Sequence, residues 1–402
     1  MNYSKEEVLQ FVREEDVKFI RLAFCDVFGK PKNISIMPGE LERAFGDGIS
    51  FDGSAIAGFT DEACSDLFLH PEPESLMPLP WRPEHGQVVQ MFSSITDPNG
   101  RPFLKDTRYL LKESVRRAHE AGYDFSFGAE QEFYLFLLDE NSKPTRIPCD
   151  EAGYMDIAPE DHGENVRREI CLTLEKMGLH PERSHHEEGP GQNEIDFKYS
   201  DPLTAADQAM TFQRVVKTIA FRNGLEADFS PKPLPGQPGS GFHINLSVQP
   251  HSEEAFSAMI GGILEHILDM TAFLNPVKES YLRLGDHKAP QYISWSHGNR
   301  SQLIRIPAAK GQYRRMELRS ADPLANPYLA FALMIDAALE GIQNHLSPKA
   351  GEDRNLYLTD LDAVSSLKKL PDNLEKARHL AYESRFIREH IPAELLEAYL
   401  KH

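Results

Sequence analysis

The amino-acid sequence predicts an α+β protein with two domains, a small one over residues 1–100 and a larger one over residues 101–402. Short β-rich segments with a single helix fill the first part, whereas long helical patterns alternating with strands begin after Phe103. Residues 71–83 carry five prolines, which is typical of an extended connector. This change of pattern favours a domain boundary near residue 100.

Local signals predict the elements of the small domain. Ser4 and Glu7 have the spacing of a capping box, and apolar residues then recur at helical intervals, so we expect a helix over residues 4–14. Two β-rich runs, residues 17–24 and 32–37, flank a turn-like segment and predict a pair of strands.

The larger domain is predicted to contain five long helices that alternate with strands. These helices are residues 107–121, 164–176, 205–222, 253–273 and 327–346. No internal repeat and no low-complexity segment interrupts the order.

Composition and charge exclude several classes of protein. The 43 Lys and Arg against 62 Asp and Glu give a net charge of −19, which argues against a nucleic-acid binder. The four cysteines lie far apart with no CxxC pair, which is typical of a reducing compartment. The first residues contain no apolar run of a signal peptide, and the longest apolar stretches, 133–138 and 328–338, are too short or too interrupted to cross a bilayer. We therefore expect a soluble cytoplasmic protein whose partners are small molecules, metals or other subunits, with no nucleic acid and no membrane.

Four predicted strands alternate an apolar face with a face of charged or polar residues. The strands lie at 125–136, 241–248, 315–319 and around Glu194. Their polar faces carry Glu130 and Glu132; His243, Asn245 and Ser247; Arg315, Glu317 and Arg319; and Glu194, Asp196 and Lys198. One such strand alone is explained by an antiparallel sheet with one face in solvent. Four of them beside glycine-rich loops indicate a site.

The residue types on these faces indicate phosphoryl transfer. Glutamates with one histidine and no nearby cysteine are ligands of a hard cation such as Mg²⁺ or Mn²⁺. The arginines among the same strands, Arg300, Arg305, Arg315 and Arg319, are suited to phosphate or carboxylate. The chain has neither a GxxxxGK[ST] motif nor a strand-linked GxGxxG motif, so the site is not a P-loop or a Rossmann site.

Six segments of the chain, in the same order, resemble the type I glutamine synthetases over about residues 15–395. They are FDGSAIAGF (51–59), GAEQEF (128–133), HHEEGPGQNEIDF (185–197), PKPLPGQPGSGFH (231–243), NRSQLIRIP (299–307) and RRMELRSADPLANPYLAFA (314–332). The resemblance implies a small β-grasp-like N-terminal domain and a large C-terminal domain whose antiparallel sheet forms the active-site funnel, with helices outside. It also implies an ATP-dependent ligase that forms a γ-glutamyl amide through an acyl phosphate, in most members glutamine from glutamate and ammonia.

The resemblance also implies roles for individual residues. Two or more Mg²⁺ or Mn²⁺ ions would be bound, one by Glu132, Glu187 and Glu194 near the acceptor carboxylate and one by Glu130, His243 and Glu317 at the phosphates of ATP, the co-substrate. Gly239, Arg283, Arg300 and Arg319 would bind glutamate and phosphate, with Arg300 and Arg319 catalytic, and Ser247, Arg305 and Arg315 would contact ATP. Asp52 would reach into the site of a neighbouring subunit and take a proton from ammonium.

The implied assembly is a homo-oligomer, a hexamer or a dodecamer, with active sites between subunits. The family stacks two rings partly through its C-terminal tail. Because the chain stops at His402, some tens of residues before the usual end, we expect weaker stacking and favour a hexamer.

One departure from the family pattern concerns the loop 285–288. The resemblance implies a glutamate before Ala289 that helps to deprotonate ammonium, but the chain has Lys288 there. A lysine within about 4 Å of the bound cation would oppose it by on the order of 1 to 4 kcal/mol and could not accept its proton. We therefore expect weak use of ammonia or a preference for another amine. The alternative is that the loop turns Lys288 outward and Asp286 or another acid takes its place.

Three functions remain open from the sequence. They are a ligase that makes glutamine, a related ligase that joins glutamate to a larger amine, and a non-catalytic regulatory relative. Retention of all six metal-ligand positions argues against the last.

Overall fold

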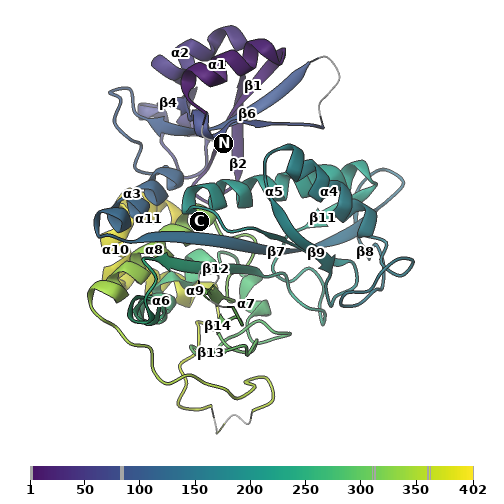
Figure 1. Cartoon of the computed structure of the whole chain (residues 1–402), viewed down its shortest axis with the longest axis vertical. Coiled ribbons are helices and arrows are strands. Elements are labelled where there is room, and N and C mark those ends of the chain that lie inside the picture. The colour runs from purple at the N-terminus through teal and green to yellow at the C-terminus, as the bar shows by residue number, and fades with distance from the viewer. Residues whose placement is uncertain are drawn as a thin grey trace. The chain divides into compact units, whose positions relative to one another are not determined.

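The computed structural model describes residues 3–81, 86–309, 311, 314–359, 362 and 364–401. The chain divides into two compact units. Unit 1 comprises Met1–Glu113, Leu172–Leu179 and Ile391–His402, and unit 2 comprises Ser114–Cys171 and His180–His390. Figure 1 shows the mixture of helices and sheets that the sequence predicted, and the α+β fold class is confirmed.

Unit 1 is built on a sheet of six strands. The strands are β1 (Val17–Cys25), β2 (Pro31–Ile36), β3 (Ile49–Asp52), β4 (Asp66–Pro71), β5 (Met77–Pro78) and β6 (Gln87–Thr96). Their order is β2-β1-β6-β4-β3, with β5 beside β6, and β1 runs parallel to β6. The two predicted strands are confirmed as β1 and β2, whereas β3, β4 and β6 were not predicted.

Helices and turns complete unit 1. The predicted first helix is confirmed as α1 (Lys5–Glu14), with the capping box of Ser4 and Glu7 formed. The other helices are α2 (Leu41–Gly46), α11 (Ala393–Leu400) and the short 3₁₀ turns η1 (Pro38–Glu40), η2 (Gly53–Ala55), η3 (Glu62–Cys64) and η4 (Pro73–Ser75).

The proline-rich segment differs from its prediction as an extended connector. It contains η4 and strand β5, and Met77 and Pro78 pair with β6. Proline lacks an N–H donor, but it is tolerated at the first turn of a helix and on a short edge strand, which are the places of Pro73 and Pro78. Residues 82–85, which include the last of its prolines, lie outside the described residues.

Unit 2 is built on a sheet of nine strands. They are β7 (Asp124–Leu138), β8 (Pro144–Pro148), β9 (Pro181–His186), β10 (Gln192–Phe197), β11 (Leu225–Asp228), β12 (Phe242–Gln249), β13 (Trp295–His297), β14 (Ile304–Ile306) and β15 (Met316–Leu318). The order is β13-β14-β15-β12-β7-β10-β9, with β8 and β11 also paired to β7. All its pairings except β13 with β14 are antiparallel. The long strand β7 lies at the centre of this sheet (Figure 1).

The five long helices that the sequence predicted are confirmed within a few residues. They are α3 (Thr107–Glu120), α4 (Glu164–Lys176), α5 (Pro202–Arg222), α6 (Glu253–Leu274) and α8 (Pro327–Gln343). Helix α5 begins earlier than predicted because the side chain of Asp201 accepts the Thr204 N–H as an N-cap. The short helices α7 (Ser280–Arg283), α9 (Leu374–Glu383) and α10 (Arg385–His390) were not predicted.

Helices α6 and α8 form the core of unit 2. They meet through glycines, because a methyl group at Gly262 would lie 2.0 Å from the Ala337 carbonyl oxygen and one at Gly341 would lie 2.3 Å from that of Ala258. By length and composition α6 could cross a membrane, but 67% of its most apolar window is buried inside the protein, as in the core helix of a soluble protein. Because apolar side chains of the sheet pack here, as Phe127 of β7 does on Phe331 of α8 at 4.2 Å, the polar side chains of β7 lie on its other face.

Candidate active site

The polar face of the large sheet gathers acidic side chains from β7, β10 and β15 with His243 and Asn245 of β12. Antiparallel register places His243 opposite Glu130, Glu194 opposite Glu132, and Asn245 opposite Glu317. Cross-strand neighbours on one face lie about 5 Å apart, so these side chains meet although they are distant in sequence. The polar faces that the sequence predicted separately therefore form one surface.

All six predicted metal ligands lie in this surface. Ligand atoms lie within 4.8 Å of one another in each of the groups Glu130, His243 and Glu317; Glu132, Glu194 and His243; and His185, Glu187 and Glu194. His243 belongs to two groups, because its Nδ1 lies 3.5 Å from Glu130 Oε2 while its Nε2 lies 3.9 Å from Glu132 Oε1. The structure thus places the two predicted ligand sets side by side. The first set is Glu130, His243 and Glu317, and the second set is Glu132, Glu187 and Glu194.

The two sets differ in electrostatics. Burial would raise the pKa of Glu130, but the hydrogen bond and charge of His243, together with Asn245, lower it to about 2. Burial and the charge of Glu132 raise the pKa of Glu187 to about 8, and burial and neighbouring carboxylates also raise the pKa of Glu194. Carboxylates that crowd together in this way require a proton or a cation between them. The second set is therefore short of positive charge.

The donor atoms fit a hard divalent cation. Each of the three groups offers two carboxylates with one imidazole nitrogen, and none includes a thiolate. Among the described residues a further buried group, Asp150, Asp161 and His186, has the same composition, but it is already bonded internally. The His186 Nε2 lies 2.9 Å from Asp150 Oδ1, and Arg167 donates to Asp161. That group supports the site instead of opening onto it.

Several residues that orient Glu132 were missed from the sequence. The Gly241 N–H donates to Glu132 Oε2 at 2.8 Å, and the side-chain amide of Gln192 donates to the same oxygen at 3.1 Å and to the Gly239 carbonyl at 3.2 Å. Gln192 lies two residues before Glu194 on β10, so strand alternation could have placed it on the same face.

Arginines flank the first set. Arg319 and Arg305 both donate to Glu317, and Arg315 Nε donates to Asn245 Oδ1 at 3.1 Å. Burial alone would raise the pKa of Glu317, but Arg319, with His243 and Arg305, holds it below its ordinary value. Three of the predicted arginines thus place positive charge beside the first set.

Arg283 and Gly239 lie together beside the site. Buried Arg283 donates to the carbonyl oxygens of Ser320 and Arg319 at 2.8 and 3.2 Å. A Cβ atom on residue 239 would lie 2.8 Å from Arg283 Cγ and 2.4 Å from the Pro231 carbonyl oxygen, which explains the glycine. Ser247 follows His243 and Asn245 on the same face of β12.

The structure does not bring every predicted site residue into this cluster. Arg300 is exposed, although it lies close enough to Tyr154 for its positive charge to act against the rise in the pKa of that phenol. Asp52 belongs to unit 1, where it accepts hydrogen bonds from the Ser54 N–H and hydroxyl at 2.9 and 2.6 Å. These bonds lower the pKa of Asp52, so the side chain remains anionic.

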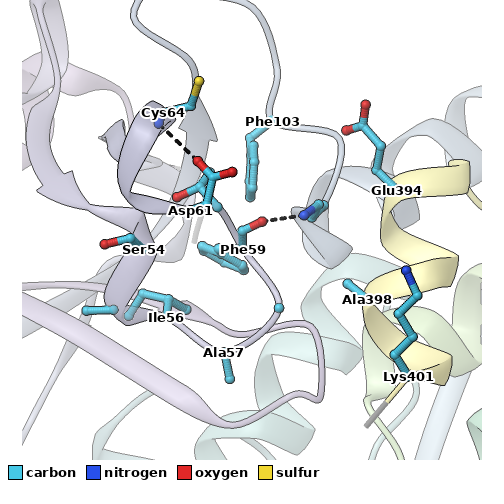
Figure 2. Close-up of a pocket in the computed structure, with 14 residues that line it drawn as sticks. Ser54, Ile56, Ala57, Phe59, Asp61, Cys64, Phe103, Glu394, Ala398 and Lys401 are labelled. Atoms are coloured by element: carbon cyan, nitrogen blue, oxygen red, sulfur yellow. Dashed lines mark hydrogen bonds between the residues drawn. The ribbon is translucent and has the colours of Figure 1, made fainter.

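A cavity of about 900 Å³ follows Asp52 along the chain (Figure 2). It is lined by residues 54–61 with Cys64, Phe103, Lys105, Glu394, Ala398 and Lys401. Asp61 accepts the Cys64 N–H within it, and Lys105 donates to the Phe59 carbonyl. The lining gathers no group of metal-type ligands among the described residues, so the carboxylate cluster of unit 2 remains the candidate site.

Comparison with known proteins agrees with this geometry. The family described as "Glutamine synthetase, catalytic domain" matches residues 104–402, and "Glutamine synthetase, beta-Grasp domain" matches residues 16–98. The prediction of a β-grasp N-terminal domain and the resemblance found in the sequence are thereby confirmed.

Relatives named glutamine synthetase cover nearly the whole chain. One from Clostridium saccharobutylicum is 44% identical over 96% of this chain and 91% of its own length, and one from Methanosarcina mazei is 44% identical over 99% and 92%. A solved structure described as a GmaS/ADP complex covers 100% of this chain and 94% of its own, with 29% identity and a TM-score of 0.89. The Plasmodium falciparum glutamine synthetase has the same fold, with a TM-score of 0.87 at 21% identity.

Proposed function

The chain belongs to the glutamine synthetase family, and we propose that the carboxylate cluster of unit 2 joins glutamate to ammonia with the conversion of ATP to ADP and phosphate. The observation that carries this proposal is the pair of ligand sets that meet at His243, with Arg305 and Arg319 both donating to Glu317 of the first set. One set suits a nucleotide phosphate and the other an acceptor carboxylate. The GmaS structure with ADP supports nucleotide binding at such a site.

The residues divide the chemistry between them. Glu130, His243 and Glu317 would hold the Mg²⁺ or Mn²⁺ at the phosphates of ATP, and Glu132, Glu187 and Glu194 would hold a second one near the acceptor carboxylate. When bound, such cations neutralise charge on the phosphoryl and carboxylate oxygens. Ser247, Arg305 and Arg315 contact ATP, and Gly239, Arg283, Arg300 and Arg319 bind glutamate and the transferred phosphoryl group.

The reaction follows from the chemistry of a carboxylate, which cannot be attacked directly because oxide is a very poor leaving group. A γ-carboxylate oxygen of glutamate bonds to the γ-phosphorus of ATP, and ADP leaves. Arg319 and Arg305 stabilise the negative charge that develops on the transferred group. Asp52 of a neighbouring subunit first accepts a proton from ammonium, the lone pair of the resulting ammonia attacks the acyl carbon, and phosphate leaves with the remaining surplus proton.

Assembly, domains and location complete the proposal. The protein is a homo-oligomer, a hexamer or a dodecamer, as membership of this family implies, and Asp52 of unit 1 serves the cluster of a neighbouring subunit. Residues 1–100 form the β-grasp domain and residues 101–402 the catalytic domain, which the two family matches support. The protein acts in the cytoplasm, where glutamate and ATP are available and thiols stay reduced.

The direct test is phosphate release from ATP that depends on both glutamate and an amine. We expect release with ammonium, and glutamine as the product. Release only with an organic amine would instead favour the second function, a ligase for a larger amine. The comparison is needed because the chain has Lys288 where the family pattern has a glutamate. No release with glutamate and any amine would contradict the proposal.

A further inference from the structure

A tight loop, residues 285–289, follows helix α7. The Gly285 N–H donates to the Ala289 carbonyl at 2.8 Å, and the Ala289 N–H donates to the Asp286 carbonyl at 3.0 Å. His287 and Lys288 have φ of 38° and 63°, in the left-handed region that residues with a side chain seldom adopt. Because such a conformation is held only by surrounding contacts, the direction in which Lys288 points is fixed by its partners.

The loop is tied to two parts of the candidate site. Asp286 Oδ2 lies 2.6 Å from Lys232 Nζ, which also donates to the Gln237 carbonyl at 2.7 Å in the loop that carries Gly239. Lys288 Nζ forms an ion pair with Glu188, the residue after Glu187. Asp286 thus pairs with Lys232, whereas Lys288 pairs with Glu188 next to the ligand Glu187.

Lys288 lies on the acceptor side of the cluster. Its ammonium group lies over the ring of Tyr154, 5.5 Å from the centroid, and the Glu188 N–H donates to Glu187 Oε2 at 3.1 Å. Tyr154 also meets His185 edge to face at 5.4 Å, and His185 Nε2 lies 3.2 Å from Glu194 Oε1. An aromatic face bordered by carboxylates is a binding position for an ammonium ion.

We infer that Lys288 occupies the cation position on the acceptor side and must leave it before an ammonium or alkylammonium substrate can bind there. This inference rests on the proposed function and adds a residue that sets the affinity for the amine. The side chains of Lys288 and Glu188 remain 47% and 35% exposed, and ion pairs of such exposure are weak. Lys288 is thus a displaceable gate that competes with the amine.

The test compares two amines in variants of Lys288. Lys288→Met keeps most of the length of the side chain and removes its charge, so the KM for ammonium should fall by roughly two- to fivefold, the range expected for a partly exposed charge. The kcat and the KM for ATP should not change. Hydroxylamine is mostly uncharged at neutral pH, so its KM should also stay the same.

Three further measurements separate a gate from a structural effect. Lys288→Arg keeps the charge and should behave as the wild type. Lys278→Met removes a similar exposed charge, one that lies 4.0 Å from Glu375 on α9, and should not alter the KM for ammonium. Added NaCl should reduce the difference between Lys288→Met and the wild type, because salt screens exposed charges.

Hydrogen exchange of residues 284–290 gives a readout independent of turnover. Exchange should be faster in Lys288→Met, and in the wild type it should rise when ammonium displaces Lys288. An unchanged KM for ammonium in Lys288→Met, or an equal fall for hydroxylamine, would overturn the inference. If neither amine is used, the proposed function fails, and exchange that does not respond to ammonium then overturns the gate as well.

Discussion

His243 is the residue at which the two ligand sets of the site meet. Its two ring nitrogens face different carboxylates, Glu130 on one side and Glu132 on the other. A substitution in the first set should therefore impair phosphoryl transfer while leaving the neighbouring set in place. This separation allows each set to be tested alone.

Neutralising one acid of the first set should abolish turnover. Glu130→Gln or Glu317→Gln replaces a carboxylate by an amide of the same shape, which removes the charge that a divalent cation requires, and activity should fall by about a hundredfold or more. Steady-state assays with Mg²⁺ and Mn²⁺ measure the loss, and circular dichroism checks the fold. Glu226→Gln on β11, outside the described ligand groups, is the matched control. Near-normal activity of either site variant would contradict the metal assignment.

Gly239 is a second residue whose substitution has a predictable effect on glutamate binding. In Gly239→Ala the new methyl group meets the Pro231 carbonyl oxygen at 2.4 Å and Arg283 Cγ at 2.8 Å, so the loop or Arg283 must shift. Such overpacking costs about 1–3 kcal/mol and should raise the KM for glutamate. Gly39→Ala, where nothing lies within 4 Å, should change neither stability nor KM. A wild-type KM in Gly239→Ala would remove this loop from the glutamate site.

The polar face was predictable at the residue scale because successive side chains of a strand point to opposite faces of the sheet. Glu130 and Glu132 had to share a face of β7 once the apolar residues beside them filled the other. Which strand lies opposite was not predictable, since the pairing of Glu194 with Glu132 depends on a register between segments about sixty residues apart. The ion pair of Lys288 with Glu188 joins two loops that are distant in sequence, and no local sequence pattern predicts such a contact.

At the scale of elements, the long helices were predictable and the short ones were not. Helices α6 and α8 are apolar over many turns, so their pattern is clear. Helix α9 is as long as the predicted α1 but lacks its capping box, and α10 is too short for a periodic signal. Strand β6 was missed for another reason. It is buried on both faces and pairs with β1, β4 and β5, so it lacks the alternation that marks a half-exposed strand.

A buried ion cluster joins three elements of unit 1, the turn η4, helix α3 and strand β6. Glu72, which follows β4 and begins the turn η4, forms ion pairs with Arg108 and Lys112 of α3 and accepts the hydroxyl of Ser94 on β6. Burial would raise the pKa of Glu72, but Arg108 and Lys112 lower it to about 2. The carboxylate therefore stabilises the folded protein only while it is ionised.

Glu72→Gln should destabilise the protein in a pH-dependent way. A folded pKa of about 2 against an ordinary value of 4.5 means that the stabilisation is complete above pH 4.5 and disappears as pH falls towards 2. We expect a loss of about 2–3 kcal/mol at neutral pH, measured by urea unfolding, that shrinks in acid. Glu74→Gln, an exposed acid two residues later, is the control. An equal loss at pH 3 and pH 7 would show that the charge of Glu72 is not the cause.

At the scale of the whole molecule, the proposed reaction needs residues from both units. The ligand sets lie in unit 2, and Asp52 lies in unit 1 at the end of β3. Its hydrogen bonds from Ser54 keep it anionic, as a proton acceptor for ammonium requires. Whether Asp52 serves its own chain or a neighbour decides whether a single subunit can be active.

Mixed oligomers answer that question, because each of two inactive variants carries one defect. Asp52→Asn keeps the ligand sets intact, and Glu130→Gln keeps Asp52 intact. If a site takes its ligands from one subunit and Asp52 from the next, an equal mixture gives about a quarter of the sites both functional parts, since each part is intact with a chance of about one half. Co-expressed variants should then recover about a quarter of wild-type activity, while each variant alone stays inactive. If the site lay within one chain, every subunit would keep one defect and no activity would return.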